Sequence, residues 1–103
     1  MSTATIPTSY IRSVLPPRDA VLDKVLRHSL LDERMPPIQV DDNAGRVLQL
    51  LTAIHAPRKV IEIGALFGYS TIHIARALVP GATLVALEID EAAAALARQN
   101  VDA

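Results

Sequence analysis

The sequence contains no cysteine among its 103 residues. Disulfides, thiolate nucleophiles and thiolate metal sites are therefore all excluded, and this absence is typical of proteins from a reducing compartment. Aromatic residues are almost as scarce, because the whole set consists of Tyr10, Phe67 and Tyr69. Three aromatic rings cannot form an extended stacking platform for nucleic-acid bases.

Long apolar runs and an excess of one charge are also missing. No segment offers 18 apolar residues without a charge, and the first residues lack the basic and apolar pattern of a secretory signal, so no membrane partner is predicted. Ten basic and eleven acidic residues are interspersed and give a net charge of -1, which argues against a nucleic-acid partner. Half of the residues are hydrophobic. The composition therefore predicts a cytoplasmic protein with at most one globular domain.

The N-terminal third divides into an arm and a helix. Residues 1–17 are polar and contain Pro7, Pro16 and Pro17, so we expect an irregular N-terminal arm. Residues 18–34 place apolar side chains at helical spacing and leave charged ones between them, which predicts an amphipathic helix that ends before two prolines. The apolar positions are Val21, Leu22, Val25, Leu26, Leu30 and Leu31.

A second helix is predicted to begin at Asp41 or Asp42, whose carboxylate can cap free amide groups, and to end before Pro57. Both aspartates are interpreted as helix caps rather than as metal ligands. The side chains expected to point inward are Val47, Leu48, Leu51 and Ile54.

The remaining sequence predicts a β-α-β unit. Residues 59–63 and 83–87 are short runs rich in β-branched or aliphatic residues, and residues 69–78 between them have helical spacing. Apart from Glu62, both runs are apolar on both faces, which is typical of parallel strands covered by helices on each side. Asp90 then caps an alanine-rich helix that reaches about residue 100. The sequence therefore predicts an α/β fold.

A glycine-bounded loop joins the first predicted strand to the next helix, in the sequence V-I-E-I-G-A-L-F-G-Y-S. Gly64 lets a ligand approach the backbone, and Gly68 permits a tight turn with close helix–strand packing. The helix N-terminus after this loop favours an anionic group. Glu88, at the end of the second strand, can accept hydrogen bonds from ribose hydroxyls. A ligand with a ribose and a small anionic group therefore fits this crevice.

The motif E-I-G-x-x-x-G-Y-S, followed by L-V-A-L-E-I-D, resembles the catechol and caffeoyl-CoA type O-methyltransferases of the class I methyltransferase family. The resemblance covers residues 39–100 and includes Q-V-D-D-N-A-G. It implies a Rossmann-like class I methyltransferase fold, truncated after about two parallel strands and preceded by N-terminal helices. Residues 18–103 would then form a partial domain that binds S-adenosylmethionine.

The resemblance also implies contacts with the methionine end of this cofactor. Val40 would offer its backbone amide to the carboxylate, and Ser70 its amide and hydroxyl. Glu62 and Gly64 would flank the amino group. The residues themselves also allow a structural role for Glu62, with a partner such as Lys59 or a helix amide.

The other contacts implied by the resemblance lie nearer the nucleoside end. Tyr69 would pack beside the cofactor, Glu88 would bind the ribose, and Ile89 would lie against the adenine, with Gly68 closing the loop. Leu66 stands where some relatives carry an aromatic residue. No catalytic or metal-binding residue is assigned, and His28, His55 and His73 receive no role.

The function that the resemblance implies is methyl transfer from S-adenosylmethionine to a small-molecule hydroxyl, phenolic in kind. In the full-length family a divalent cation assists, but its ligands and the catalytic lysine follow the third strand. We therefore expect a truncated form that lacks the acceptor and metal half and has no turnover alone.

The sequence leaves two alternative functions open. The first is a non-catalytic interaction module that forms a homodimer through its apolar N-terminal helix or complements another chain. The second is a fragment of a nicotinamide-dependent oxidoreductase. The glycine spacing G-x-x-x-G argues against the second, because dinucleotide binding requires G-x-G-x-x-G.

Overall fold

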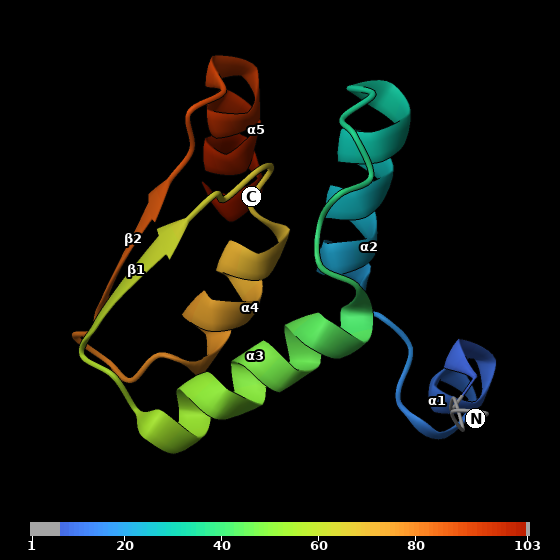
Figure 1. The fold of residues 1–103 in the computed structure, drawn as a ribbon, viewed down its shortest axis with the longest axis horizontal. Helices are drawn as coiled ribbons and strands as arrows, with labels where there is room; N and C mark the ends of the chain where they lie inside the picture. Colours follow the sequence, from blue (N-terminus) through green and yellow to red (C-terminus); the bar gives the residue numbers. More distant parts are fainter. Residues whose placement is uncertain (1–6, 103) are drawn as a thin grey trace, which may run out of the picture.

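The computed structural model describes residues 7–102 and consists of a two-stranded sheet with helices (Figure 1). Residues 1–6 of the predicted arm lie outside the described residues. The elements in chain order are α1 (Thr8–Val14), α2 (Ala20–Arg27), the π-helical turn η1 (His28–Asp32), α3 (Asp42–His55), β1 (Lys59–Ile63), α4 (Tyr69–Ala77), β2 (Thr83–Leu87) and α5 (Glu91–Asp102).

The two strands are parallel, as the sequence predicts. Their register pairs Lys59 with Thr83 and Ile63 with Leu87, and α4 forms the connection between them. Asp90 precedes α5 and accepts a hydrogen bond from the amide of Ala93 at 3.1 Å. The predicted β-α-β unit and its capped final helix are thereby confirmed, and both strands have the predicted bounds.

Within the described residues, helices cover one face of the sheet and leave the other face open. In Figure 1, α4 and α5 lie on the same side of the two strands. Glu62 on β1 is partly buried, whereas Ile61 and Ile63 on the opposite face are 70% and 85% exposed. The prediction that both faces are covered is therefore wrong for residues 7–102. The apolar side chains of each strand indicate that both faces favour burial. They do not indicate which element covers each face.

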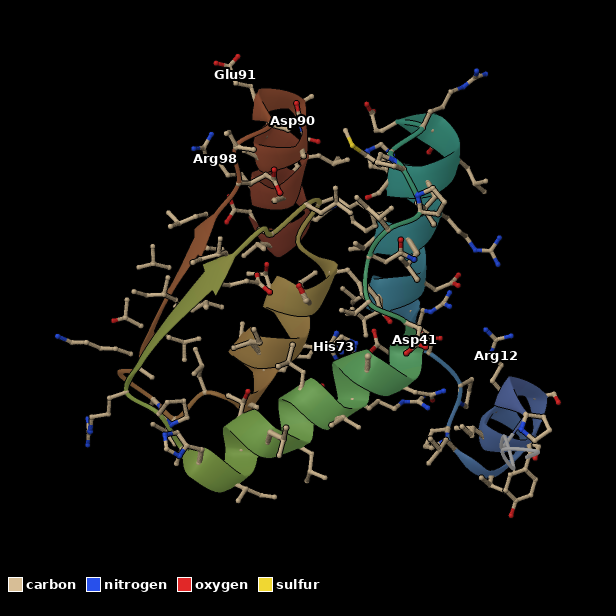
Figure 2. All side chains as sticks on the ribbon, in the orientation of Figure 1. Arg12, Asp41, His73, Asp90, Glu91 and Arg98 are labelled. Carbon is tan, nitrogen blue, oxygen red and sulfur yellow. The ribbon has the colours of Figure 1, made fainter. Side chains whose placement is uncertain are left out.

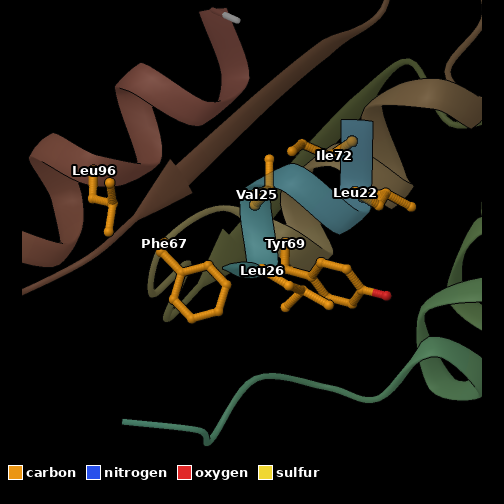
Figure 3. Packing of buried hydrophobic residues seen from close by; sticks show 7 residues of the cluster. All are labelled: Leu22, Val25, Leu26, Phe67, Tyr69, Ile72 and Leu96. Carbon is orange, nitrogen blue, oxygen red and sulfur yellow. The ribbon is translucent and has the colours of Figure 1, made fainter. Parts of the chain in front are cut away.

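The hydrophobic core forms where α2 meets the loop before α4, with α5 on the far side (Figure 3). Asp19 caps α2 by accepting a hydrogen bond from the amide of Leu22 at 3.0 Å. The predicted amphipathic helix is confirmed, although its last part is the π-helical turn η1. The cluster of buried side chains consists of Leu22, Val25, Leu26, Phe67, Tyr69, Ile72 and Leu96.

The N-terminal arm is more ordered than predicted, because residues Thr8–Val14 form α1. Pro7 is the N-cap residue of this helix. The helix needs no amide hydrogen at its start, so a proline there is tolerated. Pro16 and Pro17 follow its end. The prolines therefore bound a short helix, where we expected them to prevent one.

Helix α3 has the predicted bounds but faces the core with a different side. Asp41 caps it by accepting a hydrogen bond from the amide of Ala44 at 2.7 Å. Of the predicted inward residues, Leu48 is partly buried, but Val47, Leu51 and Ile54 are exposed, whereas Gly45 is buried. An apolar stripe shows which side of a helix favours burial, but the contact is decided by close approach to α4 at Gly45.

The close approach of α3 to α4 is made at Gly45 and His73. A Cβ atom on Gly45 would lie 2.6 Å from two atoms of the His73 ring, so only a glycine fits there. Nδ1 of His73 lies 3.0 Å from the side-chain oxygen of Gln49. An amide oxygen only accepts, so Nδ1 carries the proton. Burial lowers the pKa of His73, which keeps the ring neutral. Figure 2 shows His73 between the two helices.

In the described part of the chain, no helix has both the length and the apolar character that crossing a lipid bilayer requires.

Candidate functional site

The glycine-bounded loop leads from β1 to α4 and is anchored on the end of β2. The amides of Gly64 and Ala65 donate to the carbonyl of Leu87 at 2.8 Å and 3.1 Å, respectively. Gly64 and Gly68 have φ angles of +85° and +92°, which glycine adopts without strain. The predicted tight turn at Gly68 is present. A Cβ atom added at Gly68 would lie 3.4 Å from the backbone of Ala97 on α5. Gly68 therefore packs closely against a helix, where we expected close packing against a strand.

Glu88 holds this loop in shape from the end of β2. Its Oε1 accepts a hydrogen bond from the amide of Leu66 at 2.7 Å, and its Oε2 accepts one from the amide of Asp90 at 3.0 Å. Both hydrogen bonds lower the pKa of Glu88, and the bond from Asp90 has the larger effect. The carboxylate is therefore ionised at neutral pH. Leu66 has a left-handed φ of 51°, which is unfavourable for a side chain with a Cβ. Glu88 therefore stabilises an uncommon backbone conformation.

A cavity of about 400 Å³ opens beside this loop. It contains five of the eight predicted cofactor-binding residues, namely Val40, Gly64, Tyr69, Ser70 and Glu88. Glu62, Gly68 and Ile89 do not line it, and the side chain of Ile89 is 99% exposed. The fold thus brings together residues that lie as far apart in the sequence as positions 40 and 88.

One end of the cavity offers hydrogen-bond donors. The N-terminus of α4 lies there, and Gly68, its N-cap residue, has no side chain to cap it. The first amides of a helix have no partner within it and carry a partial positive charge, so this end favours an anion. A Cβ atom added at Gly64 would meet no atom within 4 Å outside the two neighbouring residues, so the space beside this glycine is open. A carboxylate and the backbone around it therefore fit this end of the cavity.

Glu62 lies outside the cavity and has its own partners on α4. The hydroxyl of Ser70 donates to its Oε2 at 2.6 Å, and the hydroxyl of Thr71 donates to its Oε1. These hydroxyls provide the structural partner for which the sequence suggested Lys59 or a helix amide. Glu62 thus ties β1 to α4, and its contact with a cofactor amino group stays a prediction.

Gln39 is a cavity residue that the sequence reasoning did not select. Its side chain lines the cavity, and its Oε1 is buried without a hydrogen-bond partner in the described part of the chain. A buried acceptor without a donor costs about 1–3 kcal/mol. The only sequence signal was its position in the Q-V-D-D-N-A-G segment, directly before Val40.

Tyr69 forms a wall of the cavity and connects it to the N-terminal helices. Its hydroxyl, which points toward α3 in Figure 3, donates to Asp42. Arg18 holds the same carboxylate with two hydrogen bonds, of 3.0 Å and 2.9 Å. The bond from Arg18 lowers the pKa of Asp42, and burial raises the pKa of Tyr69. The tyrosine therefore stays protonated as a donor to Asp42. Sequence spacing gave no sign of these contacts.

Asn100 supports the loop from the other side. Its side-chain amide donates to the carbonyl of Phe67 at 2.8 Å and to the hydroxyl of Ser29 at 3.1 Å. All three groups are buried. Because buried polar groups rarely go unpaired, this network fixes η1, the loop and α5 relative to one another. The cavity wall is thus part of the folded core.

Within residues 7–102, no three or more histidine, aspartate or glutamate side chains gather in an arrangement that could hold a metal ion.

Comparisons with known proteins agree with the resemblance noted in the sequence. A family described as O-methyltransferase matches residues 13–103. Catechol O-methyltransferase from Niastella koreensis is 41% identical over 93 residues, which are 90% of this chain and 42% of that protein. Catechol O-methyltransferase B from Danio rerio is 39% identical over 82 residues, which are 80% of this chain and 29% of that protein.

Solved structures give the same result for the fold. An O-methyltransferase from Bacillus cereus in complex with SAH has a TM-score of 0.85 and 40% identity, over 91% of this chain and 42% of that one. The O-methyltransferase TomG from Streptomyces achromogenes in complex with SAM has a TM-score of 0.80 and 32% identity, over the same shares of the two chains. The predicted Rossmann-like fold is confirmed. The chain spans 42% of the length of three of these relatives and 29% of the protein from Danio rerio.

Proposed function

The chain belongs to the O-methyltransferase family, and we propose that it binds S-adenosylmethionine for methyl transfer to the hydroxyl of a small molecule. The observation that carries this proposal is the cavity between the N-terminus of α4 and Glu88. It offers amide donors at one end and an ionised carboxylate at the other. SAM and SAH each carry an amino acid carboxylate at one end and a ribose further along the same molecule.

Each polar group of the proposed ligand would meet a complementary group. The amides at the start of α4 and of Val40 would bind the carboxylate, since helix N-termini favour anions. Glu88 would accept hydrogen bonds from the ribose hydroxyls, because each of its oxygens has acceptor capacity left beside one backbone bond. Ile89 follows Glu88 and is exposed, so its apolar side chain is available to cover the adenine.

When bound, S-adenosylmethionine supplies a methyl group on a positively charged sulfur that an oxygen nucleophile can displace. The contribution of this chain would be to hold and orient the donor, which is a large part of what a transfer reaction requires. Gly64 leaves room beside the loop, and Tyr69 closes the cavity toward the N-terminal helices. The acceptor is proposed to be a phenolic hydroxyl, because two of the similar proteins are named catechol O-methyltransferases.

Replacing Glu88 with glutamine is expected to weaken S-adenosylhomocysteine binding about tenfold, because a hydrogen bond to a charged group contributes roughly 1.5–3 kcal/mol. Titration calorimetry on the full chain measures this. Glu91→Gln is the matched control, since Glu91 lies in the first turn of α5 nearby and is exposed. NAD serves as the control ligand. Equal affinity for NAD, or an unchanged affinity in E88Q, would contradict the proposed site.

The open face of the sheet favours a second role, in which this chain binds a second copy of itself. Ile61, Ile63 and Leu87 leave apolar surface exposed on a parallel sheet, and such sheets occur almost only with both faces covered. Val47, Leu51 and Ile54 of α3 add a further exposed apolar stripe. Exposed patches of this kind mark protein–protein contacts.

Light scattering on a concentration series tests this second role. We expect the mass to rise from 11.1 kDa toward twice that value. Ile63→Lys should keep the chain monomeric, because a dimer would bury the new charge. Arg58→Lys, at an exposed position before β1, is the control. A constant mass at all concentrations for the unaltered chain would rule out self-association through this face.

A further inference from the structure

Two segments from different parts of the chain form the end of the cavity that is proposed to bind the cofactor carboxylate. Val40 precedes α3, whereas Tyr69 and Ser70 begin α4, much later in the sequence. The proposed function requires amides from both segments to bind one carboxylate. A ligand that contacts two segments binds well only when both are already held in the right relative position. The position of Val40 relative to α4 therefore matters for binding.

A side-chain hydrogen bond joins these two segments next to the cavity. The hydroxyl of Tyr69 donates to Oδ1 of Asp42, which lies two residues after Val40. Arg18 donates to the same carboxylate, from Nε to Oδ1 at 3.0 Å and from Nη2 to Oδ2 at 2.9 Å. Asp42 does not line the cavity. It therefore acts on a ligand there only through Tyr69 and through the backbone that it shares with Val40.

Packing alone does not fix the ring of Tyr69. The residue is buried, but it forms a wall of two cavities, the one beside the loop and a second one of about 530 Å³ between α2, α3 and α4. The ring of His73 meets it edge-on, with the ring centroids 5.1 Å apart. Space on two sides leaves the tyrosine ring more freedom than a close-packed core position allows. The hydrogen bond to Asp42 is therefore a main restraint on its position.

We propose that Asp42 is a positioning residue for the cofactor, because it accepts the hydrogen bond from Tyr69 and so holds the segment of Val40 against the start of α4. This role rests on the proposed function. Arg18 orients the carboxylate, since a guanidinium that donates twice fixes the plane of its partner. The segment before α2 thus contributes to a cavity that Arg18 itself does not line.

Titration calorimetry of the full chain with two ligands tests this role. S-adenosylhomocysteine reaches the amino acid end of the cavity, whereas 5′-methylthioadenosine keeps the nucleoside and lacks the amino acid group. For Tyr69→Phe we expect the affinity for S-adenosylhomocysteine to fall about fivefold, because apparent affinity falls with the fraction of molecules in the competent arrangement. The affinity for 5′-methylthioadenosine should not change. Tyr10→Phe is the matched control, because Tyr10 on α1 is 59% exposed.

Variants of Asp42 show whether the lost bond causes the effect. Asp42→Ala removes the acceptor and should reproduce the loss, whereas Asp42→Asn keeps an oxygen that can accept from Tyr69 and should recover most of the affinity. The double variant with Tyr69→Phe and Asp42→Ala should bind about as well as Asp42→Ala alone, since both changes remove the same bond. Circular dichroism confirms that each variant is folded. Tyr69→Phe keeps the ring and leaves Asp42 paired with Arg18, so it tests the role even if Asp42→Ala does not fold.

The pattern across ligands and variants separates the outcomes. An unchanged affinity of Tyr69→Phe for S-adenosylhomocysteine would overturn the inference. An equal loss for both ligands would overturn it as well, because it would indicate a general structural effect. So would a loss in Asp42→Asn as large as that in Asp42→Ala. In these cases the proposed function would stand on binding by the unaltered chain. If the unaltered chain binds neither ligand, the proposed function fails and the inference fails with it.

Discussion

Replacing Phe67 with alanine is expected to lower the free energy of unfolding by about 3–5 kcal/mol, the usual result when a buried phenylalanine is truncated. Phe67 is fully buried (0% exposed). Its ring lies in the cluster that joins α2, the loop and α5 (Figure 3). Domains of this size are stable by only about 5–15 kcal/mol, so the loss removes a large part of the total.

Urea unfolding followed by circular dichroism measures this effect. Phe67→Leu keeps most of the apolar volume and should cost less than about 1.5 kcal/mol. Val14→Ala is the surface control, because Val14 on α1 is 60% exposed, and it should change stability by no more than about 0.5 kcal/mol. A loss below about 1 kcal/mol for F67A would mean that the ring is not part of a packed core.

The position of Phe67 connects the stability of the fold with the shape of the cavity. The residue lines the cavity, and its carbonyl accepts the buried hydrogen bond from Asn100. The loop next to the proposed cofactor is therefore held by core packing on one side and by Glu88 on the other. A loop fixed in this way loses little conformational entropy when a ligand binds.

The sequence alone predicted those helices and strands whose bounds depend on local patterns. Strands β1 and β2 begin and end at the predicted residues, and Asp41 and Asp90 cap the predicted helices. Strand composition, cap residues and glycine positions act over a few residues, so they can be read directly. The cavity at the ends of the strands follows from the parallel topology, which is why Gly64 and Glu88 were found together.

Contacts between distant segments could not be predicted in this way. Tyr69, Asp42 and Arg18 meet across more than 20 residues of sequence, and no spacing rule connects them. Periodicity likewise identified an apolar stripe on α3 but not the side that packs against α4. For Gln39, the informative property is that its side-chain oxygen has no hydrogen-bond partner among residues 7–102, which only the three-dimensional structure shows.

The packing of α3 on α4 leads to a prediction that opposes helix propensity. Alanine is a better helix former than glycine by about 1 kcal/mol, so propensity alone predicts that Gly45→Ala stabilises α3. We expect instead a net loss of about 3 kcal/mol, near the upper end of the range for overpacking a core. The new Cβ would lie 2.6 Å from two ring atoms of His73.

The ring cannot easily move aside. His73 is buried, and its Nδ1 donates to Gln49 on the same helix as Gly45. Moving the ring would break this bond, and moving α3 would shift Asp42 away from Tyr69. The overlap therefore cannot be relieved without breaking other contacts, because packed interiors leave few voids.

A double-mutant cycle distinguishes this clash from a general effect of changing Gly45. His73→Ala removes the ring, so adding Gly45→Ala in that background should cost little or even stabilise the chain through helix propensity. The two changes should therefore be strongly non-additive, with a coupling of about 3 kcal/mol, at the upper end of the range seen for contacting residues. Urea unfolding of the four proteins at pH 7 gives the coupling. Additive losses would show that His73 is not what excludes a side chain at position 45, and that α3 approaches α4 for another reason.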